Sequence, residues 1–318
     1  MNILLLVAGL LTLIVGGEFL VKGAVGIAKK AHISPLVIGM TVISFGTSAP
    51  ELVVSIKAAL TGSPAISIGN VIGSNIANIG MVLGITVLIF PIIVDRNSKI
   101  LDWPMMMLAS ILFFLFAFNN IITFWEGLTL FSILIAFTTY LIASSRKKTK
   151  KALAEEEELI EKQAKSVHSL VSIGFVLLGL VGLFFGAGWL LDGAVNIASK
   201  LGMSKSVIGV TIVAFATSVP ELVTSAVAAF KKETDISIGN LIGSNLFNIM
   251  AVIGITAMVK PIPVEQSVLD SDFIWMLAIA AALLPLMLIG KKLNRFKGFL
   301  LLGSYVAYIA ILIINLKS

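Results

Sequence analysis

The stretch VIGMTVISFGTSAPELVVSIKAA at residues 37–59 returns later in the chain as VIGVTIVAFATSVPELVTSAVAA at 207–229. The same offset, without a gap, aligns ISIGNVIGSNIANI (66–79) with ISIGNLIGSNLFNI (236–249). Over 37–86 against 207–256, 29 of 50 positions are identical. Two unrelated apolar helices do not share Thr-Ser-x-Pro-Glu and Gly-Ser-Asn-x-x-Asn at one spacing, so the chain contains an internal repeat.

The composition is that of a membrane protein. Hydrophobic residues make up 58% of the 318 positions and charged residues 13%, more apolar surface than a soluble domain can bury. Long apolar runs separated by short charged loops predict ten membrane-spanning helices, the first retained because it exceeds a signal-peptide core and lacks a preceding basic segment. The runs fall at about 3–28, 35–60, 66–90, 103–118, 121–144, 169–199, 205–230, 236–259, 273–290 and 296–315.

We therefore predict an all-α polytopic membrane protein of two five-helix repeats, 1–144 and 169–318, joined by a linker at 145–168. The linker is basic and then acidic, and we expect a solvated helix without a function of its own. Because five is an odd number, the second repeat should enter the membrane from the opposite side. Inverted repeats are typical of secondary transporters that work by alternating access, with ion sites near the midplane where the repeats meet.

Charge and residue usage narrow the function further. With both termini outside, seventeen Lys and Arg residues lie in inner loops and four in outer ones, which predicts a cytoplasmic linker in the cell (inner) membrane. This bias accounts for the net charge of +6, so nothing indicates nucleic-acid binding. Cysteine is absent, which excludes disulfides and thiol chemistry. We expect no cofactor and infer no obligatory protein partner beyond the lipid bilayer.

Each repeat places one carboxylate, Glu51 or Glu221, inside an apolar helix, directly after a proline. Proline removes a backbone donor and its ring clashes with the carbonyl four residues back, so both helices should break there and free backbone carbonyls. A carboxylate near mid-membrane without a neighbouring Lys or Arg requires a cation or a proton. For single Ser and Thr residues a structural hydrogen bond is the more common role, and Asn70 and Asn240 also fit a purely helix-joining role.

The third and eighth predicted spans add polar side chains at equivalent positions. Ser74 and Asn78 share one helix face, as do Ser244 and Asn248. Together with the two carboxylates they form an all-oxygen set without His or Cys, which suits hard cations such as Ca²⁺ and Na⁺. Two carboxylates balance one Ca²⁺, and in its absence we expect protons to compete for them.

At these residues the chain resembles the calcium/cation antiporter superfamily, in its prokaryotic sodium/calcium exchanger branch. The motifs are GTSAPE (46–51) with GNVIGSNIAN (69–78), and ATSVPE (216–221) with GNLIGSNLFN (239–248). The two family motifs therefore span 37–86 and 207–256, and the resemblance covers essentially the whole chain. It implies an antiporter that exchanges about three Na⁺ for one Ca²⁺, with a sliding pair formed by the first and sixth spans.

The resemblance also implies particular ligands by motif position. The Ca²⁺ ligands would be the carboxylates of Glu51 and Glu221 with the backbone carbonyls of Thr47 and Thr217. The Na⁺ sites would use Ser48, Ser74, Ser218 and Ser244 with the carbonyls of Ser44 and Ala214. Asn78 and Asn248 would lie at the centre.

Two positions depart from the family pattern. Ala216 stands where the family usually has Gly, which would narrow the second half-site. Asn248 stands where potassium-dependent relatives have Asp, which argues against K⁺ co-transport.

Other functions remain open at this stage. A Ca²⁺/H⁺ or other divalent-cation exchanger would use the same oxygens, and Mn²⁺ or Sr²⁺ would accept the same ligands. A cation channel would also line its pore with oxygen atoms, although two inverted halves favour alternating access. An intramembrane enzyme is disfavoured because Ser48 and Ser218 have no adjacent His or Lys, and no His-Glu-x-x-His pattern occurs.

Overall fold

The computed structural model describes residues 2–62, 65–157, 169–200, 214–290 and 292–315, which are almost entirely helical. The first half contains α1 (Asn2–Ala31), α2 (Pro35–Ile38), η1 (Gly39–Ile43), α3 (Ser44–Thr47), α4 (Ala49–Leu60), α5 (Ala65–Ala77), η2 (Asn78–Leu83), α6 (Gly84–Ile89), β1 (Ile92–Ile93), η3 (Ser98–Asp102), α7 (Trp103–Ala117), β2 (Ile121–Ile122) and α8 (Phe124–Glu157). The second half contains α9 (Ser169–Lys200), α11 (Ala214–Thr217), α12 (Val219–Phe230), α13 (Thr234–Phe247), η5 (Asn248–Ile253), α14 (Gly254–Val259), β3 (Ile262–Pro263), α15 (Gln266–Asp270), α16 (Asp272–Leu288), β4 (Lys292–Leu293) and α17 (Arg295–Asn315). Segments labelled η are π-helical.

The fold is that of a multi-pass membrane protein, as predicted. Eight helices in the described residues are long and apolar enough to cross a membrane, and the bent pair Pro35–Thr47 and Ala49–Leu60 makes a ninth. The seventh predicted span is described only from α11 onward, since residues 201–213 lie outside the described part, as do linker residues 158–168. The predicted number of ten spans therefore stays a prediction.

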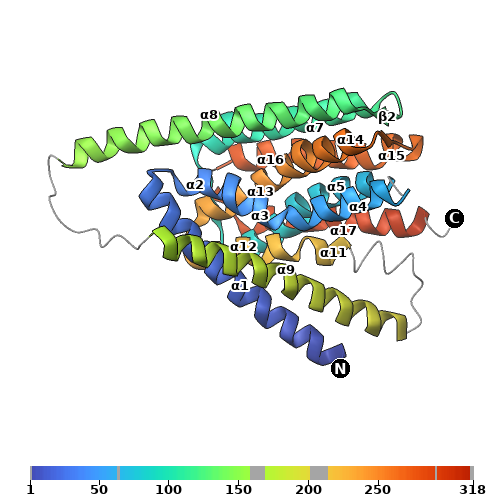
Figure 1. Ribbon diagram of the computed structural model, residues 1–318, viewed down its shortest axis with the longest axis horizontal. Coiled ribbons are helices and arrows are strands. Elements are labelled where there is room, and N and C mark those ends of the chain that lie inside the picture. The colour runs from blue at the N-terminus through green and yellow to red at the C-terminus, as the bar shows by residue number, and fades with distance from the viewer. Residues whose placement is uncertain (1, 63–64, 158–168, 201–213, 291, 316–318) are drawn as a thin grey trace.

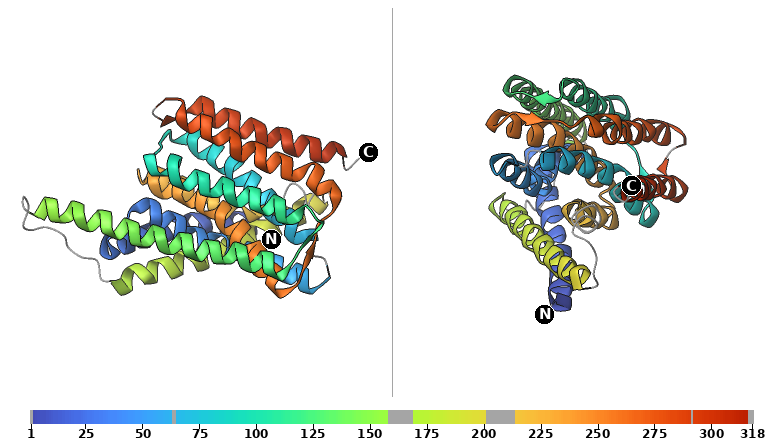
Figure 2. Two further views of the ribbon diagram at one scale, coloured as in Figure 1. Left: turned by 90° about the horizontal axis from the view of Figure 1, so that it is seen from above. Right: turned by 90° about the vertical axis from the view of Figure 1, so that its right-hand side faces the viewer.

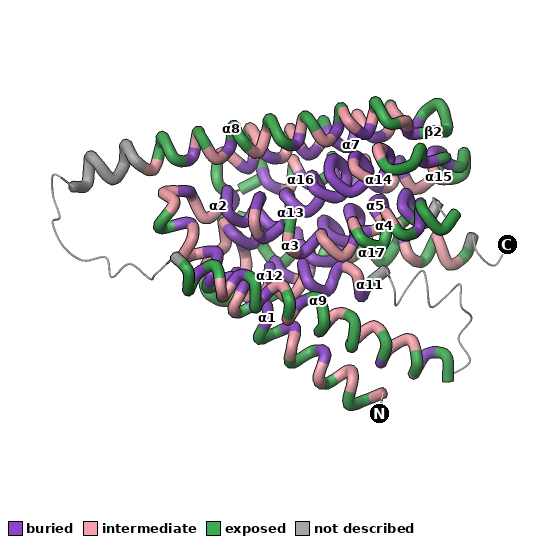
Figure 3. Tube along the Cα trace, viewed as in Figure 1, coloured by how far each residue is buried: buried purple, intermediate pink, exposed green. Residues whose placement is uncertain are grey.

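The most polar spans are the most buried ones. The central span of α5, η2 and α6 is 78% buried, and that of α13, η5 and α14 is 83% buried. The six other long spans are only 22–33% buried in the protein and present apolar side chains outward (Figure 1; Figure 3). Because Ser and Asn in the central spans are costly in lipid, the outer helices shield them from the membrane.

Helices α1 and α9 form a tightly packed pair at one edge of the bundle (Figure 2, right). They pack mainly against each other, and α1 also packs against α12. A Cβ atom on Gly9 would lie 2.7 Å from the backbone nitrogen of Leu190 and 2.8 Å from the carbonyl oxygen of Gly186. Only glycine allows this approach, so small residues hold the pair together as in other membrane helix dimers.

Helix α8 runs from Phe124 to Glu157, so the described first part of the linker is helical, as expected. One feature of the fold was not predicted from the sequence. Short antiparallel pairs link the two halves: β1 pairs with β4, and β2 pairs with β3. Each pair satisfies backbone groups in loops at the ends of spans, where they would otherwise lack partners.

Candidate functional site

Both proline motifs interrupt their helices one turn before the carboxylate, as predicted. Ser48 lies between α3 and α4 with φ −88° and ψ 2°, and the two helices diverge by 42°. Ser218 lies between α11 and α12 with nearly the same angles, −91° and 2°. Thr47 and Thr217 are the last residues of the helices before the breaks. The backbone therefore has the irregularity that is tolerated at membrane depth only around a buried site.

The carboxylates of Glu51 and Glu221 are buried and have no hydrogen-bond partner at any of their four oxygen atoms. Their residues are 1% and 0% exposed, respectively. A charged group in this state is strongly disfavoured unless a cation or a proton compensates it. The structure thus provides two uncompensated acids in the interior of a membrane protein.

Other predicted site residues share this lack of partners. Ser48 and Ser218 are buried, and their hydroxyl groups make no hydrogen bond. Asn78 and Asn248 are also buried, and both the oxygen and the nitrogen of each side-chain amide lack partners. Buried polar atoms are normally satisfied, so a cluster of unsatisfied ones indicates the place of a ligand.

The two halves of the chain contribute to one cluster. The carboxylate of Glu221 lies close to that of Glu51 and to the hydroxyl groups of Thr47 and Ser48 from the other half. The Thr47 hydroxyl donates to Asn240 Oδ1 at 3.3 Å and lies 3.4 Å from Ser244 Oγ. Hydroxyl, amide and carboxylate groups from both motif pairs therefore meet at the centre of the molecule.

The remaining predicted ligands are the backbone carbonyls of Ser44, Ala214 and Thr217 and the hydroxyl groups of Ser74 and Ser244. The Ser44 carbonyl accepts from the Ser48 backbone nitrogen at 3.0 Å, while its hydroxyl donates to the carbonyls of Gly39 and Asn240. The Thr47 hydroxyl lies 3.4 Å from the Ser44 carbonyl oxygen and is shared between it and Asn240 Oδ1. Ala214 is the first residue of α11, and Thr217 beside the break is half-buried. Ser74 is buried on α5, like Ser244 on α13.

Asn70 and Asn240 make the helix-joining contacts that the sequence analysis considered for them, through two serines that it did not single out. Asn70 Nδ2 donates to Ser55 Oγ at 3.1 Å, and Asn240 Nδ2 donates to Ser225 Oγ at 3.0 Å. Each serine lies four residues after its glutamate and so shares its helix face. The repeat contained this signal, because both serines recur at the same offset.

π-Helical segments begin at the two central asparagines. Segment η2 starts at Asn78 and packs against α12, whereas η5 starts at Asn248 and packs against α4. Each π-helical segment therefore packs against the helix that carries the glutamate of the other half. π-Bulges inside helices are frequent at functional sites because they redirect side chains.

The multi-pass fold and this buried cluster are typical of a membrane transporter of cations. The sequence model of the sodium/calcium exchanger protein family matches residues 1–143 and 171–314. The chain belongs to this family and is a cation/Ca²⁺ antiporter.

Individual relatives agree with this assignment. The chain is 36% identical to the putative antiporter CaxA of Alkalimonas amylolytica, covering 94% of this chain and 95% of that protein. It is 31% identical to the sodium/calcium exchanger MaX1 of Methanosarcina acetivorans, covering 98% of each. A solved structure of the sodium-calcium exchanger NCX_Mj superposes with a TM-score of 0.83 at 32% identity, over 97% of both chains.

Proposed function

We propose that the protein uses a Na⁺ gradient to move Ca²⁺ across the cell (inner) membrane by alternating access, exchanging about three Na⁺ for one Ca²⁺. The observation that carries this proposal is the buried cluster of unpartnered carboxylate, amide and hydroxyl oxygens contributed by both halves. Its donor set contains no His or Cys and suits hard cations. The similarity to MaX1, a sodium/calcium exchanger, supports Na⁺ as the coupling ion.

We assign one Ca²⁺ to the space between Glu51 and Glu221, where two charges balance one divalent ion. The carbonyls of Thr47 and Thr217 would complete its coordination at the helix breaks. The flanking Na⁺ ions would be held by Ser48, Ser74, Ser218, Ser244 and the carbonyls of Ser44 and Ala214. Asn78 and Asn248 would lie between these ions, and their neutrality keeps the total charge of the cluster at two.

We further propose that the halves 1–144 and 169–318 are inverted repeats with both termini outside. Two observations support this arrangement. At the 170-residue offset β1 corresponds to β3, and β2 corresponds to the region of β4. Because β1 pairs with β4 and β2 pairs with β3, each strand pairs with the counterpart of the other, which is the reciprocity expected of two related halves. The distribution of Lys and Arg favours a cytoplasmic linker at 145–168.

The proposal predicts a voltage-dependent flux. Three positive charges moving against two transfer one net charge per cycle, worth about 2.3 kcal/mol per 100 mV. Purified protein in liposomes loaded with Na⁺ should therefore take up ⁴⁵Ca, and uptake should rise when the interior is made positive, because each uptake cycle carries one net positive charge out of the liposome. An inside-acid liposome of matched ionic strength without Na⁺ is the control.

Each alternative function has its own outcome in this experiment. Uptake driven by the proton gradient and not by Na⁺ would identify a Ca²⁺/H⁺ exchanger and overturn the choice of coupling ion. If the rate of Ca²⁺ uptake depends on neither the Na⁺ gradient nor the proton gradient, and single-channel currents appear in a planar bilayer, the protein is a channel.

A further inference from the structure

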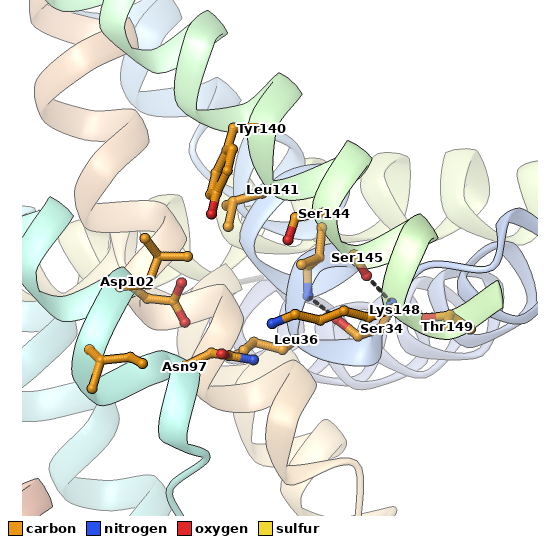
Figure 4. Close-up of a pocket in the computed structure, with 13 residues that line it drawn as sticks. Ser34, Leu36, Asn97, Asp102, Tyr140, Leu141, Ser144, Ser145, Lys148 and Thr149 are labelled. Atoms are coloured by element: carbon orange, nitrogen blue, oxygen red, sulfur yellow. Dashed lines mark hydrogen bonds between the residues drawn. The ribbon is translucent and has the colours of Figure 1, made fainter. Parts of the chain in front are cut away.

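A second polar cavity lies away from the central cluster, between the start of α2, η3 and the C-terminal part of α8. Its volume is about 280 Å³. Polar side chains on its wall include Ser34, Asn97, Asp102, Ser144 and Lys148 (Figure 4). None of these residues belongs to the proposed transport site.

Asp102 is the buried acid of this cavity. The residue is 1% exposed, and its Oδ2 atom has no hydrogen-bond partner. The buried hydroxyl of Ser98, one turn earlier in η3, lies close to this carboxylate. A buried carboxylate oxygen without a donor is costly, so this end of the cavity favours a ligand that carries a cationic N–H group.

Lys148 brings the opposite charge to the same cavity. Its side chain extends from α8, and Figure 4 shows the ammonium directed into the space that the Asp102 carboxylate faces. It makes no hydrogen bond to Asp102 Oδ2. An acid and a base that face one cavity without pairing fit a ligand with both a cationic and an anionic group.

The apolar part of the wall opens toward the membrane. Ile100 is 60% exposed and Tyr140 is 55% exposed, and both belong to helices long and apolar enough to span a bilayer. Tyr is common at the membrane interface, and the neighbouring Arg146 and Lys147 are the kind of basic flank that contacts lipid phosphates. The ligand that fits this setting carries acyl chains.

We propose that the cavity binds the zwitterionic phosphoethanolamine headgroup of a membrane phospholipid. Its ammonium donates to Asp102, and its phosphate accepts from Lys148. A phosphocholine headgroup cannot replace it, because a quaternary ammonium has no N–H to donate. A phosphoglycerol headgroup has no cation and would leave the Asp102 carboxylate uncompensated.

The second half of the chain offers a built-in control. Asp272 has the equivalent position at the 170-residue offset and lines a cavity of about 270 Å³. The described lining of that cavity includes no basic residue, and Tyr308 Oη already donates to Asp272 Oδ1 at 3.2 Å. Asp272→Asn should therefore leave the binding of phosphatidylethanolamine unchanged.

The test is lipid binding to the full-length protein in detergent, measured by native mass spectrometry. The probes are phosphatidylethanolamine, its N-methyl and N,N-dimethyl forms, phosphatidylcholine and phosphatidylglycerol with identical acyl chains. Wild type should bind phosphatidylethanolamine about tenfold more tightly than phosphatidylcholine, the order expected for one charge-assisted hydrogen bond. Asp102→Asn should abolish this preference, and Lys148→Gln should weaken the binding of both lipids about equally.

Three results with the lipid probes would overturn the proposal. Wild type could bind every member of the methylation series equally, Asp102→Asn could keep the preference for phosphatidylethanolamine over phosphatidylcholine, or Asp272→Asn could lose this preference as fully as Asp102→Asn. The methylation series uses wild-type protein only, so it tests the proposal even if the Asp102→Asn variant does not fold. Soluble phosphoethanolamine is the last probe: if it binds as tightly as the lipid, the ligand is a free metabolite and the lipid assignment is wrong.

Discussion

Glu51→Gln and Glu221→Gln should each reduce Na⁺-driven Ca²⁺ uptake to the background rate. Removing one of two unit charges that face a divalent Ca²⁺ ion about 4 Å away costs about 8 kcal/mol at an effective dielectric constant near 20. At 1.36 kcal/mol per factor of ten, this corresponds to roughly six orders of magnitude. The amide keeps the size of the side chain, so the loss measures the charge. Initial rates of ⁴⁵Ca uptake into liposomes give the comparison.

The matched control is Glu126→Gln, which removes a carboxylate at the start of α8. Glu126 Oε2 accepts from the backbone nitrogen of Thr123 at 2.7 Å and from its hydroxyl at 2.9 Å, so it has a structural role. This variant should transport at a rate close to that of wild type. If Glu51→Gln or Glu221→Gln kept more than about a tenth of the wild-type rate, the assignment of the Ca²⁺ site would be wrong.

Gly239→Ala should destabilise the protein, whereas the equivalent Gly69→Ala should not. A Cβ atom on Gly239 would clash with the carbonyl oxygen of Leu36 and lie 3.2 Å from the backbone nitrogen of Met40. Backbone atoms cannot move aside as a flexible side chain can, so overpacking of about 1–3 kcal/mol or more is expected. At Gly69, which is exposed, no described atom lies within 4 Å of the corresponding position.

Thermal unfolding in detergent measures this difference. Gly69→Ala should be neutral or stabilising, since Ala exceeds Gly in helix propensity by about 1 kcal/mol. Equal melting temperatures for the two variants would show that the close packing of α13 on α2 and η1 does not stabilise this conformation.

The repeated motifs allowed most of the candidate site to be predicted from the sequence. Glu51 and Glu221 stood out because a carboxylate in an apolar helix has few structural explanations. The breaks at Ser48 and Ser218 followed from the prolines that come next. The repeated polar positions also indicated Asn78 and Asn248, whose unpartnered amides the structure then revealed. The resemblance to the exchanger family supplied the particular role of each residue and the backbone carbonyls of Ser44 and Ala214.

Other features depend on contacts between distant parts of the chain and left no local pattern. The π-helical segments η2 and η5 have the same apolar composition as an ordinary α-helix. The strands β1 to β4 have two residues each and form only because the loops of opposite halves meet. Gly69 and Gly239 occupy the same position in the two repeats, but only Gly239 is closely packed in this conformation. Two identical motifs cannot indicate such a difference between them.

The continuation of α8 beyond residue 144 agrees with the helix expected for the linker. The charged stretch after residue 144 ends the apolar run, and the predicted span ends with it. Lys, Ala and Glu are good helix formers, so the helix continues into the linker after the hydrophobic pattern stops. A change in polarity therefore marks a membrane boundary without marking a helix boundary.

The most direct test of the central claim is equilibrium binding of ⁴⁵Ca to the purified protein. If Glu51 and Glu221 share one ion, wild type should bind one Ca²⁺ per chain, and Na⁺ should displace it competitively. Because one ion needs both carboxylates, either single variant should already lose detectable Ca²⁺ binding. Two bound Ca²⁺ per chain, or one that persists at saturating Na⁺, would contradict the account.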